Sequence, residues 1–216
     1  MKPYNPPKEP LLEIIHLDDD VLVLNKPPGL LSVPGRRPEH HDSLQSRAQQ
    51  AHPSATTVHR LDMETSGLMV MAMNKASHVH LSRQFELRQV KKRYRARVFG
   101  RLPAPQGTVE APLICDWPNR PRQMVDLKVG KPAVTHWQVL QEDAETSWVS
   151  LQPVTGRSHQ LRVHMLHLGH PILGDSLYAS GAALDMSDRL ALQSEYLSFK
   201  APGNEEPLSF QLDAEF

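Results

Sequence analysis

The feature that most constrains the fold is a continuous apolar run over residues 68–73, directly preceded by a polar segment. An unbroken run of this length predicts a strand that is buried on both faces. Thr65, Ser66 and Gly67 come just before the run, and two hydroxyl residues followed by a glycine favour a tight turn. Asp62 is therefore expected on a loop held against a buried strand, a common location for catalytic side chains.

The sequence around Asp62 allows two interpretations. Asp62 can be a catalytic carboxylate, or it can cap the turn and form a surface ion pair with Arg60, two residues earlier. An isolated Arg-Leu-Asp sequence favours the surface pair, so residues elsewhere in the chain have to decide between the two.

The remaining patterns predict an α+β fold. Strands outnumber helices, and the elements lack the regular strand-helix alternation of a parallel sheet. We expect a single domain with a mixed, mostly antiparallel sheet flanked by helices and loops. The predicted strands are residues 11–17, 21–24, 68–73, 92–99, 135–140 and 147–152, and the predicted helices are residues 42–50, 75–89 and 159–168. The expected N-caps of these helices are Asp42 or Ser43, Asn74 and Ser158.

The length of 216 residues suits one sizeable core. We predict one catalytic domain over residues 11–216, preceded by a proline-rich, flexible lead-in over residues 1–10. Cys115 is the only cysteine, and no apolar run approaches the roughly 18 residues needed to cross a bilayer. We therefore expect a soluble, cytoplasmic monomer with no membrane association and no obligate protein partner.

The charge of the chain is balanced overall and uneven locally. Lys and Arg total 24, as do Asp and Glu, whereas residues 83–101 contain eight basic residues and one acid. Residues 185–216 contain seven acids and two bases. The basic stripe can bind a polyanion such as RNA, or it can be a solvated surface.

Two further residues are candidates for a site with Asp62. Residues 92–99 alternate between basic and less polar side chains, which directs Tyr94 inward. Arg157 lies at the entrance of the third predicted helix. The Asp62 carboxylate, the Tyr94 phenol and the Arg157 guanidinium could therefore form one site, but the sequence alone does not show that they lie close together.

Other polar segments each have two interpretations. Lys26 can contact a phosphate, or it can be an exposed lysine before a rigid turn. Trp117, Arg120 and Arg122 lie in a proline-stiffened loop that can grip single-stranded RNA by stacking and charge, or form a Trp-anchored surface loop.

The histidine-rich segment near the third helix does not predict a metal site. His164, His167 and His170 recur every three residues, but Gly169 ends the helix before the third histidine, and no acidic or cysteine ligand lies nearby. We expect solvated or hydrogen-bonded histidines.

Three segments of the chain resemble the A-type pseudouridine synthases of the large ribosomal subunit. They are residues 25–29 (Asn-Lys-Pro-Pro-Gly), 59–67 (His-Arg-Leu-Asp-Met-Glu-Thr-Ser-Gly) and 156–164 (Gly-Arg-Ser-His-Gln-Leu-Arg-Val-His). The order of the three segments and the distances between them along the chain match the pattern of this family over nearly the whole chain. Residues 113–121 are similar to members that act on both 23S ribosomal RNA and transfer RNA. One departure is residues 189–194, Arg-Leu-Ala-Leu-Gln-Ser, where relatives commonly have Arg-Leu-x-Leu-His-Ala.

The resemblance implies the pseudouridine synthase fold and the isomerisation of uridines, flipped out of RNA stem-loops that include the tRNA anticodon stem-loop. It implies that Asp62 is the catalytic aspartate, that Tyr94 lies against the target base and that Arg157 pairs with the Asp62 carboxylate. Arg60 is expected to fill the gap left by the flipped uridine. Further candidate RNA contacts are His59, Lys26, Lys92 and Arg122.

The implied reaction needs no cofactor and no metal, because it involves no redox change and no net loss of atoms. Two alternatives stay open: a non-catalytic RNA-binding or folding factor, and a hydrolase acting on a glycosidic bond. A hydrolase normally uses a second acid, for which Glu64 is the only candidate nearby in sequence. The first family segment begins at residue 25, which leaves no room before it for a separate RNA-binding domain.

Overall fold

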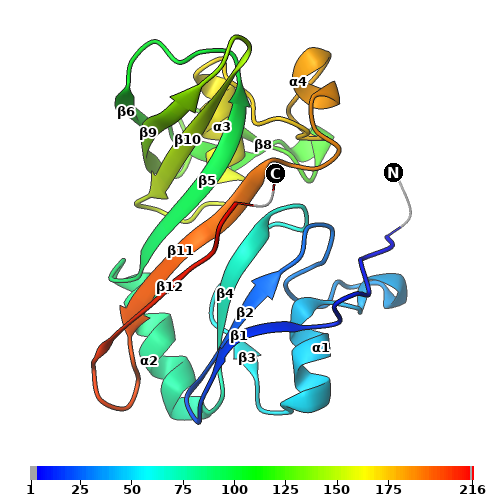
Figure 1. Ribbon diagram of the computed structural model, residues 1–216, viewed down its shortest axis with the longest axis vertical. Coiled ribbons are helices and arrows are strands. Elements are labelled where there is room, and N and C mark those ends of the chain that lie inside the picture. The colour runs from blue at the N-terminus through cyan, green and yellow to red at the C-terminus, as the bar shows by residue number, and fades with distance from the viewer. Residues whose placement is uncertain (1–3, 215) are drawn as a thin grey trace. The chain divides into compact units, whose positions relative to one another are not determined.

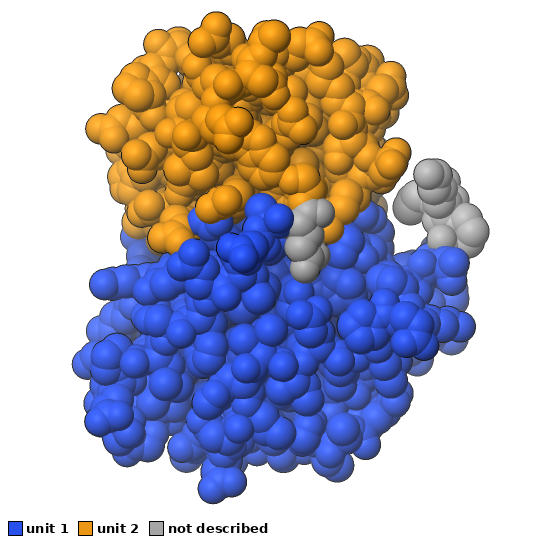
Figure 2. Space-filling view, viewed as in Figure 1, with its two compact units in different colours: residues 1–92, 193–214 blue, residues 93–192, 215–216 orange. Residues whose placement is uncertain are grey.

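The computed structural model of the protein describes residues 4–214 and 216. The chain divides into two compact units, unit 1 with residues 1–92 and 193–214, and unit 2 with residues 93–192 and 215–216 (Figure 2).

Unit 1 is built on a sheet with the strand order β1-β2-β4-β11 (Figure 1). The strands β1 and β2, both predicted, form an antiparallel hairpin, and β4 runs antiparallel to β2 and parallel to β11. Every residue of β4 is buried, which confirms the prediction of a strand covered on both faces. The strands of unit 1 are β1 (Glu13–Leu17), β2 (Val21–Lys26), β3 (Thr56–Thr57), β4 (Ser66–Ala72), β11 (Leu192–Lys200) and β12 (Pro207–Gln211).

Two capped α-helices complete unit 1, α1 (Leu44–Ala51) and α2 (Lys75–Glu86), and a short 3₁₀ helix, η1 (Pro38–His40), precedes α1. The side chain of Ser43 accepts a hydrogen bond from the Ser46 N–H, and that of Asn74 from the Ser77 N–H, so both predicted N-caps are confirmed. The inner face of α2 packs on the core of β2, β4 and β11 through Leu81.

Unit 2 contains an antiparallel sheet with the strand order β5-β10-β9-β6 and a separate hairpin of β7 and β8. The two units together therefore give the predicted α+β class with mostly antiparallel pairing. The elements of unit 2 are β5 (Lys91–Phe99), β6 (Gln106–Glu110), β7 (Leu113–Cys115), η2 (Trp117–Asn119), β8 (Gln123–Val125), β9 (Val134–Glu142), β10 (Thr146–Pro153), α3 (Gln160–His167) and α4 (Ala182–Asp185).

The start of α3 differs from the prediction. His159, and not Ser158, is the N-cap, and it has a left-handed backbone with φ of 53°. The Oε1 atom of Gln160 accepts a hydrogen bond of 3.0 Å from the Arg157 N–H, so a side chain from inside the helix satisfies this donor.

The lead-in is also more ordered than predicted. Residues 1–3 lie outside the described part, but the Tyr4 hydroxyl donates to the Asp42 carbonyl at 2.8 Å and accepts from the Leu31 N–H at 3.0 Å. Tyr4 therefore fixes this segment to the loop before α1. None of the helices among the described residues is long and apolar enough to span a membrane.

Candidate active site

Asp62 lies on the loop that joins β3 to β4 in unit 1, as predicted. The Asp62 carbonyl accepts a hydrogen bond of 3.2 Å from the Thr65 N–H, which closes a tight turn over residues 62–65. The turn lies earlier than predicted, because Ser66 and Gly67 already belong to β4. Leu61 is buried, whereas Asp62 is only partly buried and Arg60 is exposed. The loop therefore anchors itself through Leu61 and leaves the charged residues on either side of it accessible.

The backbone on both sides of Asp62 is held by the segment that follows β2. The Leu61 N–H donates to Ser32 Oγ at 3.0 Å, and the same hydroxyl donates to the Leu61 carbonyl at 2.7 Å. The Met63 carbonyl accepts from the Gly29 N–H and from Lys26 Nζ, both at 2.9 Å. These contacts give the loop a fixed backbone although it belongs to no strand.

The environment of Lys26 matches neither of the two interpretations drawn from the sequence. It is fully buried, and its Nζ donates to the carbonyls of Pro27, Leu30 and Met63 at 2.9, 2.7 and 2.9 Å. The prediction of an exposed lysine is wrong. The predicted phosphate contact conflicts with the same burial, because the three N–H donors of the ammonium point to backbone carbonyls.

His59 is hydrogen-bonded to β4. Its Nε2 accepts a hydrogen bond of 3.0 Å from the Val70 N–H, and its ring stacks on Phe85 with 4.5 Å between ring centroids. Burial, with a smaller contribution from the Lys92 charge, lowers the pKa of His59 to about 3. The hydrogen bond requires the same neutral form, because a protonated Nε2 cannot accept. His59 therefore has a structural role in this loop, which the sequence did not predict.

Tyr94 and Arg157 both belong to unit 2, whereas Asp62 belongs to unit 1. Tyr94 lies on β5 opposite Leu151 and packs against the core of unit 2, which confirms its predicted inward orientation. Arg157 lies just before α3, is exposed, and donates from Nε to the Pro132 carbonyl at 3.1 Å. Its pairing with Asp62 stays a prediction.

Sequence reasoning missed Arg162. This residue of α3 is buried, and its Nε and Nη2 donate to the two carboxylate oxygens of Asp175 at 2.8 and 2.6 Å. The guanidinium also lies over the Tyr178 ring, 5.2 Å from its centroid. An arginine between apolar neighbours in a helix requires a carboxylate partner, and that pattern could have drawn attention to Arg162.

The described residues contain no group of three or more His, Cys, Asp or Glu side chains arranged to hold a metal ion. His164 is buried between Thr135 Oγ1 and the Ala111 carbonyl, each 2.9 Å from one ring nitrogen. Burial is the main cause of its lowered pKa. The interpretation of His164 as a hydrogen-bonded histidine is confirmed.

Residues 20–167 match the family model described as RNA pseudouridylate synthase. The chain belongs to this family. It is 53% identical to the dual-specificity RNA pseudouridine synthase RluA of Escherichia coli K12, over 100% of this chain and 99% of that one. It is 50% identical to the protein of the same name from Pasteurella multocida, over 99% and 98%. The human RNA pseudouridylate synthase domain containing 1 superposes with a TM-score of 0.79 and 30% identity, over 97% of this chain and 86% of that one.

Pseudouridylate synthases are isomerases that convert uridine in RNA to pseudouridine, so the expected enzyme class and fold are confirmed. RNA is therefore the binding partner of this synthase, and its exposed residues are assessed as candidate RNA contacts. The comparisons identify the family without assigning a role to any residue.

The loop after β7 retains features suited to RNA. Trp117 is 65% exposed, so the interpretation as a Trp-anchored surface loop is wrong. The Arg120 guanidinium lies over the Trp117 ring at 4.6 Å, and that of Arg122 lies over the Tyr178 ring at 5.3 Å. Flat, charged stacks of this kind can accept an unpaired base.

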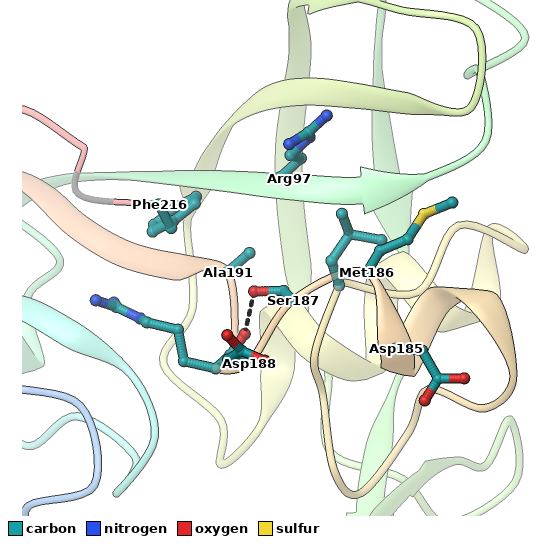
Figure 3. A pocket seen from close by; sticks show the side chains of 9 residues that line it. Arg97, Asp185, Met186, Ser187, Asp188, Ala191 and Phe216 are labelled. Carbon is teal, nitrogen blue, oxygen red and sulfur yellow. Dashed lines mark hydrogen bonds between the residues drawn. The ribbon is translucent and has the colours of Figure 1, made fainter.

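A cavity of about 520 Å³ in unit 2 lies apart from these residues (Figure 3). Arg97, Met186 and Phe216 are among its lining residues, and the Ser187 hydroxyl beside them donates to the Arg189 carbonyl at 2.7 Å. None of the predicted site residues lines this cavity, so it adds nothing to the candidate active site.

Proposed function

We propose that this protein isomerises uridines in stem-loops of 23S ribosomal RNA and of tRNA, including the anticodon stem-loop, with Asp62 as the catalytic carboxylate. The observation that carries the proposal is the Asp62 loop, whose backbone is fixed while Asp62 itself is only partly buried. The dual specificity is supported by full-length relatives that bear this description at about half identity.

The chemistry explains why one carboxylate suffices. The N1–C1′ bond of uridine breaks, the uracil turns, and a C5–C1′ bond forms. The C5 proton is then lost and N1 gains a proton, so atoms and electrons balance without water, cofactor or redox partner. Asp62 attacks or deprotonates the sugar or the base, and an enclosed site keeps water from the intermediate.

The other residues have supporting roles in this proposal. Tyr94 stacks on the flipped uracil or relays the C5 proton, and Arg157 holds the Asp62 carboxylate ionised and oriented. Arg60 fills the space that the flipped nucleotide leaves in the RNA stack. Lys92 and Arg122 contact the RNA from the catalytic domain itself, and the enzyme works as a cytoplasmic monomer.

The decisive test uses rRNA fragments and tRNA transcripts that carry tritium at uridine C5, because the reaction must release that label. The wild-type protein should release tritium and form pseudouridine, and Asp62→Asn should do neither. Undiminished release by Asp62→Asn would refute the role of Asp62, and free uracil would identify a hydrolase. Tight RNA binding by the wild type without product on every transcript would identify a binding factor.

A further inference from the structure

Ser32 makes a reciprocal pair of hydrogen bonds with one residue of the Asp62 loop. Its hydroxyl accepts from the Leu61 N–H at 3.0 Å and donates to the Leu61 carbonyl at 2.7 Å. The side chain is 3% exposed, so water does not compete for either bond. Among side chains of this size, only a hydroxyl both donates and accepts with good geometry.

The two peptide planes that flank the Asp62 Cα atom are thereby fixed. The Leu61 carbonyl belongs to the peptide that enters Asp62 and is held by Ser32. The Asp62 carbonyl belongs to the peptide that leaves it and is held by the Thr65 N–H. Because each peptide unit is rigid, holding both planes fixes the direction of the Asp62 side-chain bond.

Ser32 is itself held by the beginning of α1. The first N–H groups of a helix lack partners within the helix. Here the Leu44 N–H donates to the Leu31 carbonyl at 2.8 Å, and the Gln45 N–H donates to the Ser32 carbonyl at 3.2 Å. A continuous set of hydrogen bonds thus runs from α1 through Ser32 to the backbone of Leu61.

We propose that Ser32 is a positioning residue for the isomerisation, acting through the Leu61 backbone to orient the Asp62 carboxylate. The inference rests on the proposed catalytic role of Asp62. Ser32 contacts the loop from the side of the protein core, so its loss slows the chemical step and leaves RNA binding intact. A displacement of about 1 Å at a reacting group can cost as much as 100-fold in rate.

The test measures single-turnover tritium release and, separately, the Kd for the same stem-loop. Ser32→Ala should lower the maximal rate constant at least about 10-fold and change Kd less than about twofold. Ser32→Thr retains a hydroxyl and should recover most of the lost rate. The matched control is Ser77→Ala, because Ser77 is also a fully buried serine of unit 1 but bonds to Asp20 and Asn74.

Three outcomes would overturn the inference. They are a folded Ser32→Ala enzyme with the wild-type rate constant, an equal loss of rate in Ser77→Ala, and a loss confined to Kd. If Ser32→Ala does not fold, Ser32→Cys replaces it, because a thiol keeps the volume and bonds weakly. A Ser32→Cys enzyme at full rate would equally contradict the inference. Wild-type activity and an inactive Asp62→Asn, measured in parallel, show whether the proposed function itself holds.

Discussion

His59 shows how one side chain can make the stability of the Asp62 loop depend on pH. Its pKa is about 3 in the folded protein and 6.5 for the free side chain, so the unfolded chain binds the proton more readily. Its contribution to stability is therefore complete above pH 6.5 and is lost as the pH falls from 6.5 toward 3. The loss is at most about 1.4 kcal/mol per pH unit in that window.

We predict that His59→Gln reduces this pH dependence, because glutamine can accept from the Val70 N–H and does not titrate. The free energy of unfolding, measured in urea at intervals from pH 7 to pH 4, should fall less steeply for this variant than for the wild type. His41→Gln is the control, because His41 is exposed. Identical slopes for wild type and His59→Gln would show that the neutral ring is not what stabilises the loop.

At the scale of elements, the approach of β4 to β11 depends on Gly67. This residue has φ of 106°, and a Cβ atom added to it would lie 2.3 Å from the Ser194 carbonyl oxygen. Gly67→Ala thus combines a left-handed backbone, which costs roughly 1–2 kcal/mol, with overpacking, which costs roughly 1–3 kcal/mol. We predict a loss of about 3 kcal/mol in the free energy of unfolding, measured by urea denaturation.

Gly169 provides the matched comparison for that prediction. Its φ is 86°, and an added Cβ atom would meet nothing within 4 Å, so Gly169→Ala tests the left-handed backbone alone. It should cost about 1 kcal/mol. Equal losses for the two variants would mean that the close approach of the strands contributes nothing.

The elements that sequence patterns predicted are those whose signals are local. The apolar run of β4 and the Asn74 cap of α2 can be recognised without knowing any partner. The strand β6 was missed because its pairing with β9 is non-local and because Pro103, Pro105 and Pro112 around it give the segment the composition of a loop. No pattern marked β11, because it buries polar residues, namely Gln193, Ser194 and Glu195.

The candidate site follows the same rule. The place of Asp62 on a loop before a buried strand could be predicted because the signal lies within a few consecutive residues, although the turn falls at residues 62–65 and not at 65–67. The roles of Lys26 and Ser32 in holding this loop could not, because each bonds to a carbonyl of the Asp62 loop far away in the sequence, Met63 and Leu61, and a backbone carbonyl has no sequence signature. Arg162 was missed because its carboxylate partner, Asp175, lies outside the helix that carries it.

At the scale of the whole molecule, the division into two units has no counterpart in composition. Two of the crossings between them, at residues 92/93 and 192/193, fall inside strands, β5 and β11. A linker rich in glycine or proline can be recognised in a sequence as a boundary between units. A strand that continues from one unit into the other cannot. The sequence therefore marks no boundary between the units, and a single catalytic domain over residues 11–216 stays a prediction.

The balanced charge of the whole chain leads to the last prediction. A protein with 24 basic and 24 acidic residues attracts RNA only through local clusters of basic residues, so its affinity should still fall steeply with salt. We predict that Lys92→Ala and Arg122→Ala each reduce the slope of log K against log salt by about one, because each removes one phosphate contact.

The slope should be measured with the Asp62→Asn protein, which we expect to be inactive, and a stem-loop RNA, from low to moderate salt, so that turnover does not interfere. Lys200→Ala is the control, because this exposed lysine pairs with Glu205 at 3.4 Å and belongs to none of the candidate RNA contacts. An unchanged slope in Lys92→Ala or Arg122→Ala would remove that residue from the RNA-binding surface. A reduced slope in Lys200→Ala would instead indicate that RNA responds to the total charge of the molecule rather than to the basic cluster.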